Sequence, residues 1–106
     1  EWCFAVLFTS GSTGKPKGVQ IPHLAATSSI ASHLAVRPLP PYMRWFQFAA
    51  STFDPSLMET FMNFSSGTTI CAANQQRFLT DPESVLSELE CTHMMAMPSF
   101  AAMLNP

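Results

Sequence analysis

Short apolar runs alternate along this chain with longer segments that have the spacing of helices. The candidate strands are the ranges 3–8, 19–21, 45–49, 68–72 and 92–97. The candidate helices are the ranges 22–34, 54–67, 80–89 and 98–104. Strands that alternate with helical segments favour a parallel or mixed sheet with helices on its faces. We therefore predict an α/β fold.

The helix at 54–67 carries the clearest start and stop signals. Asp54 can cap it, Pro55 suits its first turn, and Gly67 can end it. Its expected buried stripe consists of Leu57, Met58, Phe61, Met62 and Phe64. The following helix begins with Thr-Asp-Pro-Glu at 80–83, which has the spacing of a capping box.

The composition indicates a chain that other polypeptide covers. Of its 106 residues, 47% are apolar and only 11% are charged, against about 25% charged in typical globular domains. The sequence starts at Glu1 without an initiator Met, and we expect residues 1–106 to be part of a larger domain that is truncated at both ends. A net charge of −2 gives no reason to expect nucleic acid or an anionic membrane as a partner. No run has the length of a membrane-spanning helix.

The cysteines and histidines do not form a recognisable metal or disulfide pattern. Cys3, Cys71 and Cys91 are far apart and include no Cys-x-x-Cys pair, so we expect core thiols in a reducing, cytoplasmic compartment. His33 and His93 lack metal-ligand spacing and are interpreted as ordinary helix-face or strand-end residues. The methionines at 94–103 are interpreted as core residues.

A loop rich in glycine, hydroxyls and lysine lies between the first two candidate strands. The glycines let the backbone adopt positive φ and approach a ligand closely, and exposed N–H groups in such a turn form an anion-binding nest. Hydroxyls add donors, and the lysines add positive charge. The candidate phosphate-binding residues are Thr9, Ser10, Gly11, Ser12, Thr13, Gly14, Lys15, Lys17 and Gly18.

This loop is not a Walker loop. Thr9 stands where the first glycine of that motif should be, and Pro16 stands where its magnesium-binding Ser or Thr should be. The alternative is a flexible surface linker, but a linker needs neither paired lysines nor flanking strands. The pattern therefore favours a different kind of triphosphate-binding loop.

Residues 8–19, FTSGSTGKPKGV, resemble the signature loop of adenylate-forming enzymes. That superfamily includes acyl-CoA synthetases, luciferases and the adenylation domains of nonribosomal peptide synthetases. The resemblance implies ATP as a substrate and a chain that forms part of the large N-terminal subdomain of such an enzyme. His23 also occupies a position where the family usually has a histidine.

A second motif separates the branches of this superfamily. Residues 53–59, FDPSLME, are similar to the Phe-Asp-x-Ser-x-x-Glu motif of peptide synthetase adenylation domains. The resemblance implies that Asp54 holds the α-ammonium group of an amino acid, which would select amino acids over plain acids. The alternative is a helix N-cap, and the two roles can coexist. Glu59 has no role that the spacing supports.

The resemblance extends over essentially the whole chain but covers only a fraction of an adenylation domain. Residues 97–99 and 104–106 match the same stretch, whereas the downstream magnesium-binding, ribose-binding and catalytic-lysine motifs are absent. By the resemblance, Pro55, Met58 and Met95 fall at or near substrate-pocket positions, although Pro55 replaces a usual small aliphatic residue. This pocket pattern is similar to that of fungal hydroxamate siderophore synthetases.

The resemblance implies ATP-dependent activation of an amino acid as an aminoacyl-adenylate. It implies Mg²⁺, whose ligands lie largely outside this chain, and transfer to the phosphopantetheine of a peptidyl carrier domain. Carrier and condensation domains of the same polypeptide are the expected partners. The alternatives are an acyl-CoA synthetase-like ligase, which has no need of Asp54, and a truncated chain without activity of its own.

Overall fold

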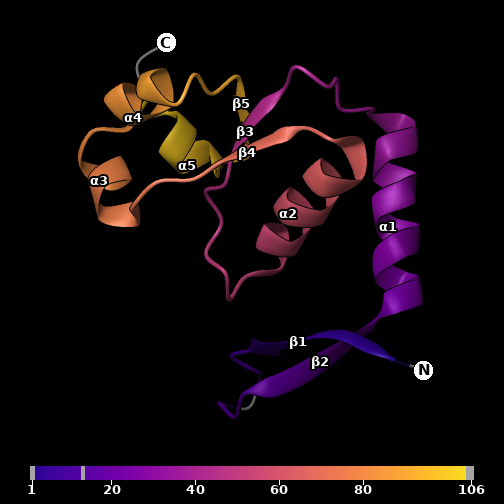
Figure 1. Cartoon of the computed structure of the whole chain (residues 1–106). Coiled ribbons are helices and arrows are strands. Elements are labelled where there is room, and N and C mark those ends of the chain that lie inside the picture. The colour runs from indigo at the N-terminus through magenta and orange to yellow at the C-terminus, as the bar shows by residue number, and fades with distance from the viewer. Residues whose placement is uncertain (1, 13, 105–106) are drawn as a thin grey trace.

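The computed structural model describes residues 2–12 and 14–104. Its elements in chain order are β1 (Cys3–Thr9), β2 (Lys17–Pro22), α1 (His23–Val36), β3 (Arg44–Phe46), α2 (Asp54–Ser66), β4 (Thr69–Cys71), α3 (Gln75–Thr80), α4 (Pro82–Glu88), β5 (His93–Met94) and α5 (Pro98–Ala101). The predicted α/β class is confirmed, and every predicted strand and helix is present (Figure 1). Only α3 is an element that the alternation does not predict.

The strands form two separate sheets. β1 and β2 form an antiparallel hairpin, in which Leu7 pairs with Val19 and Thr9 pairs with Lys17. β3 lies between β4 and β5 in a parallel sheet of order β4-β3-β5. The 14 residues of α1 carry the chain about 21 Å along the helix axis. The hairpin and the parallel sheet therefore lie at opposite ends of α1 (Figure 1).

The core lies where the parallel sheet meets α3 and α4. Phe46 of β3, Cys71 of β4, Phe78 of α3 and Val85 of α4 are all buried there. The rings of Phe46 and Phe78 pack with their centroids 4.3 Å apart. This cluster fixes the end of β3, from which the chain leads into the loop before α2.

Arg44 holds the end of α4 against β3. Its guanidinium donates two hydrogen bonds, of 3.0 and 2.9 Å, to the Leu89 carbonyl oxygen. The helix C-terminus leaves carbonyl groups without partners within the helix, so a cation is favourable at this position. No feature of the sequence around Arg44 predicts this contact.

The buried face of α2 is polar, and the predicted apolar stripe is wrong in this respect. Ser56, Glu59 and Asn63 are buried, whereas Phe64 is exposed. Periodicity places residues on a face of a helix but does not tell which face is covered. The helix ends at Gly67 as predicted, in the left-handed conformation with φ 68°.

The start of α4 differs from the predicted capping box. Asp81, not Thr80, is the N-cap, and its Oδ1 accepts a hydrogen bond of 3.2 Å from the Ser84 N–H. Thr80 is the last residue of α3. The capping box is displaced because Asn74 caps the preceding short helix, which occupies the chain up to Thr80.

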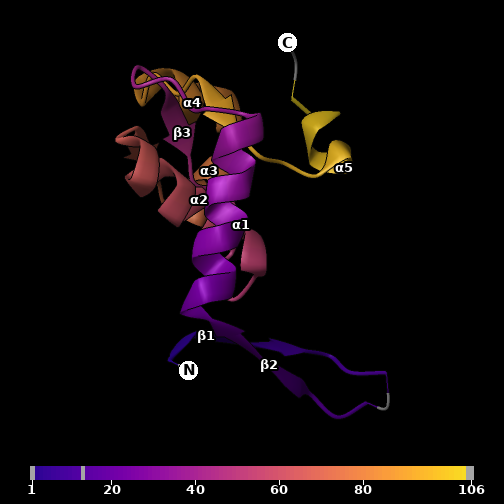
Figure 2. The same ribbon diagram turned by 90° about the vertical axis from the view of Figure 1, so that its right-hand side faces the viewer.

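Large apolar side chains are exposed on the hairpin, which projects away from the rest of the molecule (Figure 2). Val6, Phe8 and Val19 are among them. The expectation that other polypeptide covers such side chains stays a prediction.

The expectation of core cysteines is wrong for Cys3, which is exposed, whereas Cys71 is buried. It is also wrong for the methionines Met95, Met97 and Met103, which are exposed, because this segment of the chain lies largely on the surface. Within residues 2–12 and 14–104, every helix is too short or too polar to cross a bilayer.

Candidate functional site

The candidate phosphate loop lies at the tip of the β1–β2 hairpin. The Thr9–Lys17 pair closes the ladder, and the intervening residues form the connection. Gly11 and Gly14 both adopt positive φ, of 63° and 77°. The Gly14 N–H donates a hydrogen bond of 3.4 Å to the Gly11 carbonyl oxygen. The predicted glycine-dependent turn is therefore present.

The loop presents its polar groups to solvent. The residues Thr9, Ser10, Ser12, Gly14, Lys15 and Lys17 are all exposed. In the part of the chain that the structure describes, neither lysine forms an ion pair with a carboxylate. Gly18 belongs to β2, where it pairs with Phe8. Thr13 lies outside the described residues, so its predicted role has no structural account.

Gly11 is the position where the loop can carry no side chain. A Cβ atom built on Gly11 would lie 2.1 Å from the Lys15 carbonyl oxygen, a backbone atom. A Cβ atom on Gly14 would meet nothing within 4 Å. Close backbone packing across the loop therefore requires glycine at position 11.

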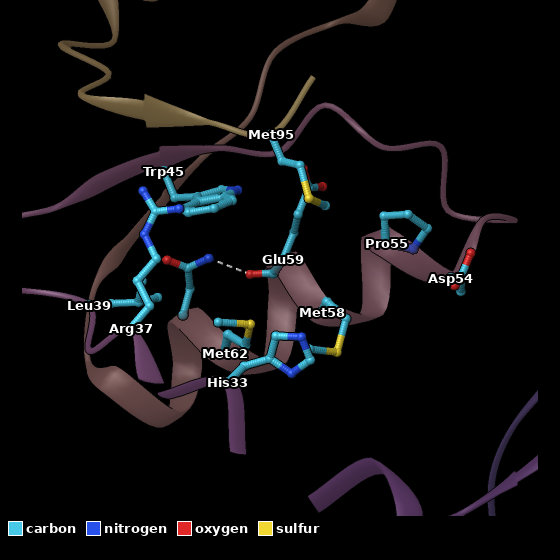
Figure 3. Close-up of a pocket in the computed structure, with 11 residues that line it drawn as sticks. His33, Arg37, Leu39, Trp45, Asp54, Pro55, Met58, Glu59, Met62 and Met95 are labelled. Atoms are coloured by element: carbon cyan, nitrogen blue, oxygen red, sulfur yellow. Dashed lines mark hydrogen bonds between the residues drawn. The ribbon is translucent and has the colours of Figure 1, made fainter. Parts of the chain in front are cut away.

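A cavity of about 350 Å³ lies between α1, α2, β3 and the segment after β5. The four predicted substrate-pocket residues, Asp54, Pro55, Met58 and Met95, all line it (Figure 3). The other lining residues are His33, Arg37, Leu39, Trp45, Glu59, Met62 and Asn63. The structure thus brings together residues that lie up to 62 positions apart in the sequence, between His33 and Met95.

Asp54 lies at the rim of this cavity, at the start of α2 (Figure 3). The N-cap position belongs to Phe53, so the interpretation of Asp54 as the N-cap is wrong. Among the described residues, its exposed carboxylate accepts no hydrogen bond. The N-terminus of a helix is a favourable place for a negative charge. Asp54 is therefore a free carboxylate available to a cationic group.

Asp54 also faces the base of the hairpin. It lines a second cavity together with Phe4 of β1 and Ile21 of β2. The Phe4 and Phe61 rings pack edge to face, with their centroids 4.9 Å apart, and join β1 to α2. The start of α2 consequently lies between the substrate-pocket candidate and the hairpin that carries the phosphate loop.

Glu59 is a buried carboxylate in the wall of the cavity, with 2% of its surface exposed. Its Oε2 accepts a hydrogen bond of 3.1 Å from the Ala49 N–H. Its Oε1 and the Trp45 Nε1 are buried without hydrogen-bond partners among the described residues. Burial raises the pKa of Glu59, and this effect is opposed by the Ala49 and Phe48 N–H groups and by the nearby Trp45 indole. Its place at the end of the FDPSLME motif is the one sequence signal that could have identified it.

α1 supplies the opposite wall of the cavity. His33 of α1 and Arg37, the residue just after this helix, both line the cavity. The His33 Nδ1 forms a hydrogen bond of 2.8 Å with the Ser29 carbonyl oxygen. The sequence predicts that His33 is an ordinary helix-face residue, because no other potential metal ligand stands at a matching spacing. That spacing gives no sign that His33 lies beside the cavity. The described residues contain no group of three His, Cys, Asp or Glu that could hold a metal ion.

The sequence model of the family described as AMP-binding enzyme matches residues 2–106. The chain belongs to this family. Its curated relatives include the nonribosomal peptide synthetase fso1 of Omphalotus olearius, 90% identical over 95% of the chain. They also include the nonribosomal peptide synthetase sidC of Aspergillus fumigatus, 58% identical over 95% of the chain. A third, the hydroxamate-type ferrichrome siderophore peptide synthetase of Schizosaccharomyces pombe, is 39% identical over 94% of it. The chain spans only 2% of the length of each of these relatives.

Solved structures of adenylate-forming enzymes share the fold. The Vibrio cholerae adenylation domain AlmE, in complex with glycyl-adenosine-5′-phosphate, matches 92% of the chain with a TM-score of 0.82 and 24% identity. The Bacillus subtilis O-succinylbenzoate coenzyme A synthetase MenE, in complex with ATP and magnesium ion, matches 92% with a TM-score of 0.76 and 26% identity. The chain spans 18% of the former structure and 20% of the latter.

Proposed function

We propose that this chain is part of the adenylation domain of a nonribosomal peptide synthetase, and that the domain activates an amino acid with ATP. The observation that carries the proposal is the free Asp54 carboxylate at the rim of a largely apolar cavity. An acyl-CoA synthetase pocket needs no such charge, whereas an amino acid brings an ammonium group that a carboxylate can bind. The names of the fungal relatives, which are peptide synthetases, support the same assignment.

The hairpin loop would hold the triphosphate of ATP. Lys15 and Lys17 would offset its charge, while Thr9, Ser10, Ser12 and Thr13 would donate hydrogen bonds to its oxygens. The exposure of the described loop side chains and the positive φ of Gly11 and Gly14 support this role. A loop already folded to receive the phosphates also stabilises the charge that develops on the leaving pyrophosphate.

The cavity would hold the amino acid. Asp54 would bind the α-ammonium group, and Pro55, Met58 and Met95 would contact the side chain. This orientation directs the substrate carboxylate toward the α-phosphate of ATP. A carboxylate oxygen forms a bond to that phosphorus as the bond to pyrophosphate breaks, which yields the aminoacyl-adenylate and pyrophosphate. The acyl group then passes to the phosphopantetheine thiol of a carrier domain.

We propose that the Mg²⁺ that accompanies ATP in this family finds most of its protein ligands elsewhere in the polypeptide. We also propose that the polypeptide contains carrier and condensation domains, acts in the cytoplasm and belongs to a siderophore synthetase. The relatives named for siderophore synthesis support the last point.

A second candidate is an acyl-CoA synthetase-like ligase. The match to MenE, at 26% identity and a TM-score of 0.76, favours it as the alternative. The two functions share the phosphate loop and differ in the need for Asp54. The substrate of an acyl-CoA synthetase would bind without an ammonium partner.

Amino-acid-dependent exchange of pyrophosphate into ATP tests the proposed function. The complete synthetase that carries this chain would be screened with the twenty standard amino acids, with one amino acid that bears a hydroxamate side chain, and with matched acids that lack the amino group. We expect exchange with an amino acid and none with its deaminated counterpart. Equal exchange with both would favour the acyl-CoA synthetase-like ligase.

A further inference from the structure

Two adjacent rows of residues run along α2 and differ in burial. Asp54, Met58 and Met62 are four residues apart and line the cavity. Ser56, Glu59 and Asn63 form the buried row beside them. The FDPSLME motif therefore contributes to both rows, and only Asp54 among its charged groups is left free.

The buried row holds the loop at 47–53, which joins β3 to α2. The Glu59 carboxylate accepts the Ala49 N–H at 3.1 Å, and the Ser56 hydroxyl donates to the Phe53 carbonyl oxygen at 2.8 Å. The Phe53 N–H in turn donates to the Ala50 carbonyl oxygen at 2.9 Å. The loop is thus hydrogen-bonded to α2 at Ala49, in the middle of the loop, and at Phe53, the residue just before Asp54.

Glu59 makes the longest-range of these ties. It is the only ionisable member of the buried row, and its carboxyl group joins α2 to a residue ten positions away, whereas the Ser56 hydroxyl reaches a residue only three positions away. It lies 2% exposed, so little water competes for the Ala49 N–H. A buried carboxylate is costly to maintain unless its hydrogen bonds are made.

We propose that Glu59 is a positioning residue for amino acid binding, which acts by fixing the loop that leads into Asp54. The loop sets where the first turn of α2 begins, and therefore where the Asp54 carboxylate stands at the cavity rim. Asp54 forms no hydrogen bond of its own among the described residues, so its position depends on the backbone that carries it. This inference rests on the proposed binding of the ammonium group by Asp54.

The test compares two variants of equal size in the complete synthetase. Glu59→Gln keeps an oxygen that can accept the Ala49 N–H, whereas Glu59→Met removes every acceptor. Michaelis constants for ATP and for the amino acid identified by the exchange screen are measured for each. A displacement of about 1 Å at a binding group can cost about 100-fold. We therefore expect Glu59→Met to raise the amino acid KM by tenfold to 100-fold, with an ATP KM within about twofold of wild type, and Glu59→Gln to restore most of the loss.

Thr68→Val is the matched control for a purely structural effect. Thr68 is also a buried polar residue bonded to α2, because its Oγ1 donates to the Asn63 carbonyl oxygen at 3.3 Å, but it lies at the far end from Asp54. We expect this variant to lower thermal stability and to leave the ratio of the two KM values unchanged. Equal changes in both KM values for Glu59→Met, or equal defects for Glu59→Met and Glu59→Gln, would overturn the proposal.

Hydrogen exchange of the wild-type enzyme keeps the proposal testable if Glu59→Met does not fold. The Ala49 amide should be protected although it lies in a loop, and fast exchange at this amide would exclude the tie to Glu59. The proposed function is tested separately, by the activity of the wild-type enzyme. If the wild type shows no amino-acid-dependent exchange, the assignment of the domain fails, whereas a normal wild type without the split in KM values overturns only the role of Glu59.

Discussion

Asp54 and Glu59 carry carboxylates from the same helix into the wall of the same cavity, but only Glu59 is held by a hydrogen bond. Asp54 is exposed, whereas Glu59 is 2% exposed and accepts the Ala49 N–H. A buried carboxyl group held by a backbone N–H supports structure, and an exposed carboxylate without a hydrogen bond can bind a ligand. This difference separates the proposed positioning residue from the proposed ligand of the ammonium group.

Replacing Asp54 with alanine should impair amino acid use far more than ATP use. A hydrogen bond to a charged group contributes about 1.5–3 kcal/mol, so we expect the amino acid KM to rise by roughly tenfold to 100-fold. Pyrophosphate exchange with each substrate varied in turn measures both constants. Asp81→Ala is the control, because Asp81 is a true N-cap and should affect stability alone. A loss of ATP affinity with unchanged amino acid affinity would contradict the assignment.

Replacing Gly11 with alanine should damage ATP use more than replacing Gly14. Both glycines have positive φ, so both substitutions carry the backbone strain of about 1 kcal/mol. Only the Gly11 methyl group would meet the Lys15 carbonyl oxygen, at 2.1 Å, and this contact forces the loop to move. The ATP KM of the two variants provides the comparison. Equal defects would show that the packing across the loop has no part in ATP binding.

Replacing Lys17 with alanine should slow pyrophosphate exchange by about tenfold to 1,000-fold, the usual range for losing one preorganised electrostatic contact. Lys17 closes the hairpin opposite Thr9 and has no carboxylate partner in the described part of the chain. Arg77→Ala is the control, because Arg77 is a surface cation paired with Glu88, remote from the hairpin. Wild-type exchange in the Lys17 variant would remove this residue from the site.

The sequence predicts the elements better than it predicts their contacts. The alternation of apolar runs locates β1 to β5, and the motif at 53–59 locates the start of α2. The polar burial of Glu59 could not be predicted, because its partner is a backbone N–H of a loop and leaves no pattern in the sequence. The contact between Arg44 and Leu89 could not be predicted either, because it joins a side chain to a backbone carbonyl group 45 positions away.

The four residues predicted to line the pocket do line one cavity, because a family resemblance already contains the long-range contacts of the fold. Trp45 and His33 belong to the same cavity but lie outside any motif that the residues display. Helical spacing within α1 places His33 on one face of this helix, yet it cannot tell that this face meets α2. Long-range packing decides such placements.

Glu59→Gln should stabilise the folded enzyme increasingly as the pH rises from about 4 to 7. Burial raises the pKa of Glu59 above its usual value of 4.5, so the folded state favours the protonated form. The stability that protonated Glu59 contributes is present below pH 4.5 and is lost as the pH rises through the raised pKa. Glutamine stays neutral throughout and avoids this loss.

Urea unfolding of the wild type and of Glu59→Gln across this pH range measures the difference in the free energy of unfolding. Thr68→Val is the control, because it replaces a neutral buried side chain and should give a nearly constant difference. A Glu59→Gln difference that stays flat, or that falls as the pH rises, would contradict the raised pKa.

Cys91 should resist alkylation in the folded protein. Burial, together with the neighbouring Cys71 thiol, raises the pKa of Cys91 to about 12. At pH 8 only about one Cys91 thiol in 10,000 is then ionised, against roughly a quarter of ordinary thiols with a pKa near 8.5. Since the thiolate is the reactive form, and a more basic thiolate is intrinsically the better nucleophile, Cys91 should react with iodoacetamide at least about tenfold more slowly than an ordinary exposed thiol. Peptide mass spectrometry over a time course, with exposed Cys3 as the internal reference and a guanidinium-unfolded sample as the control, measures these rates. Labelling of Cys91 as fast as Cys3 in the folded protein would contradict the raised pKa of this thiol.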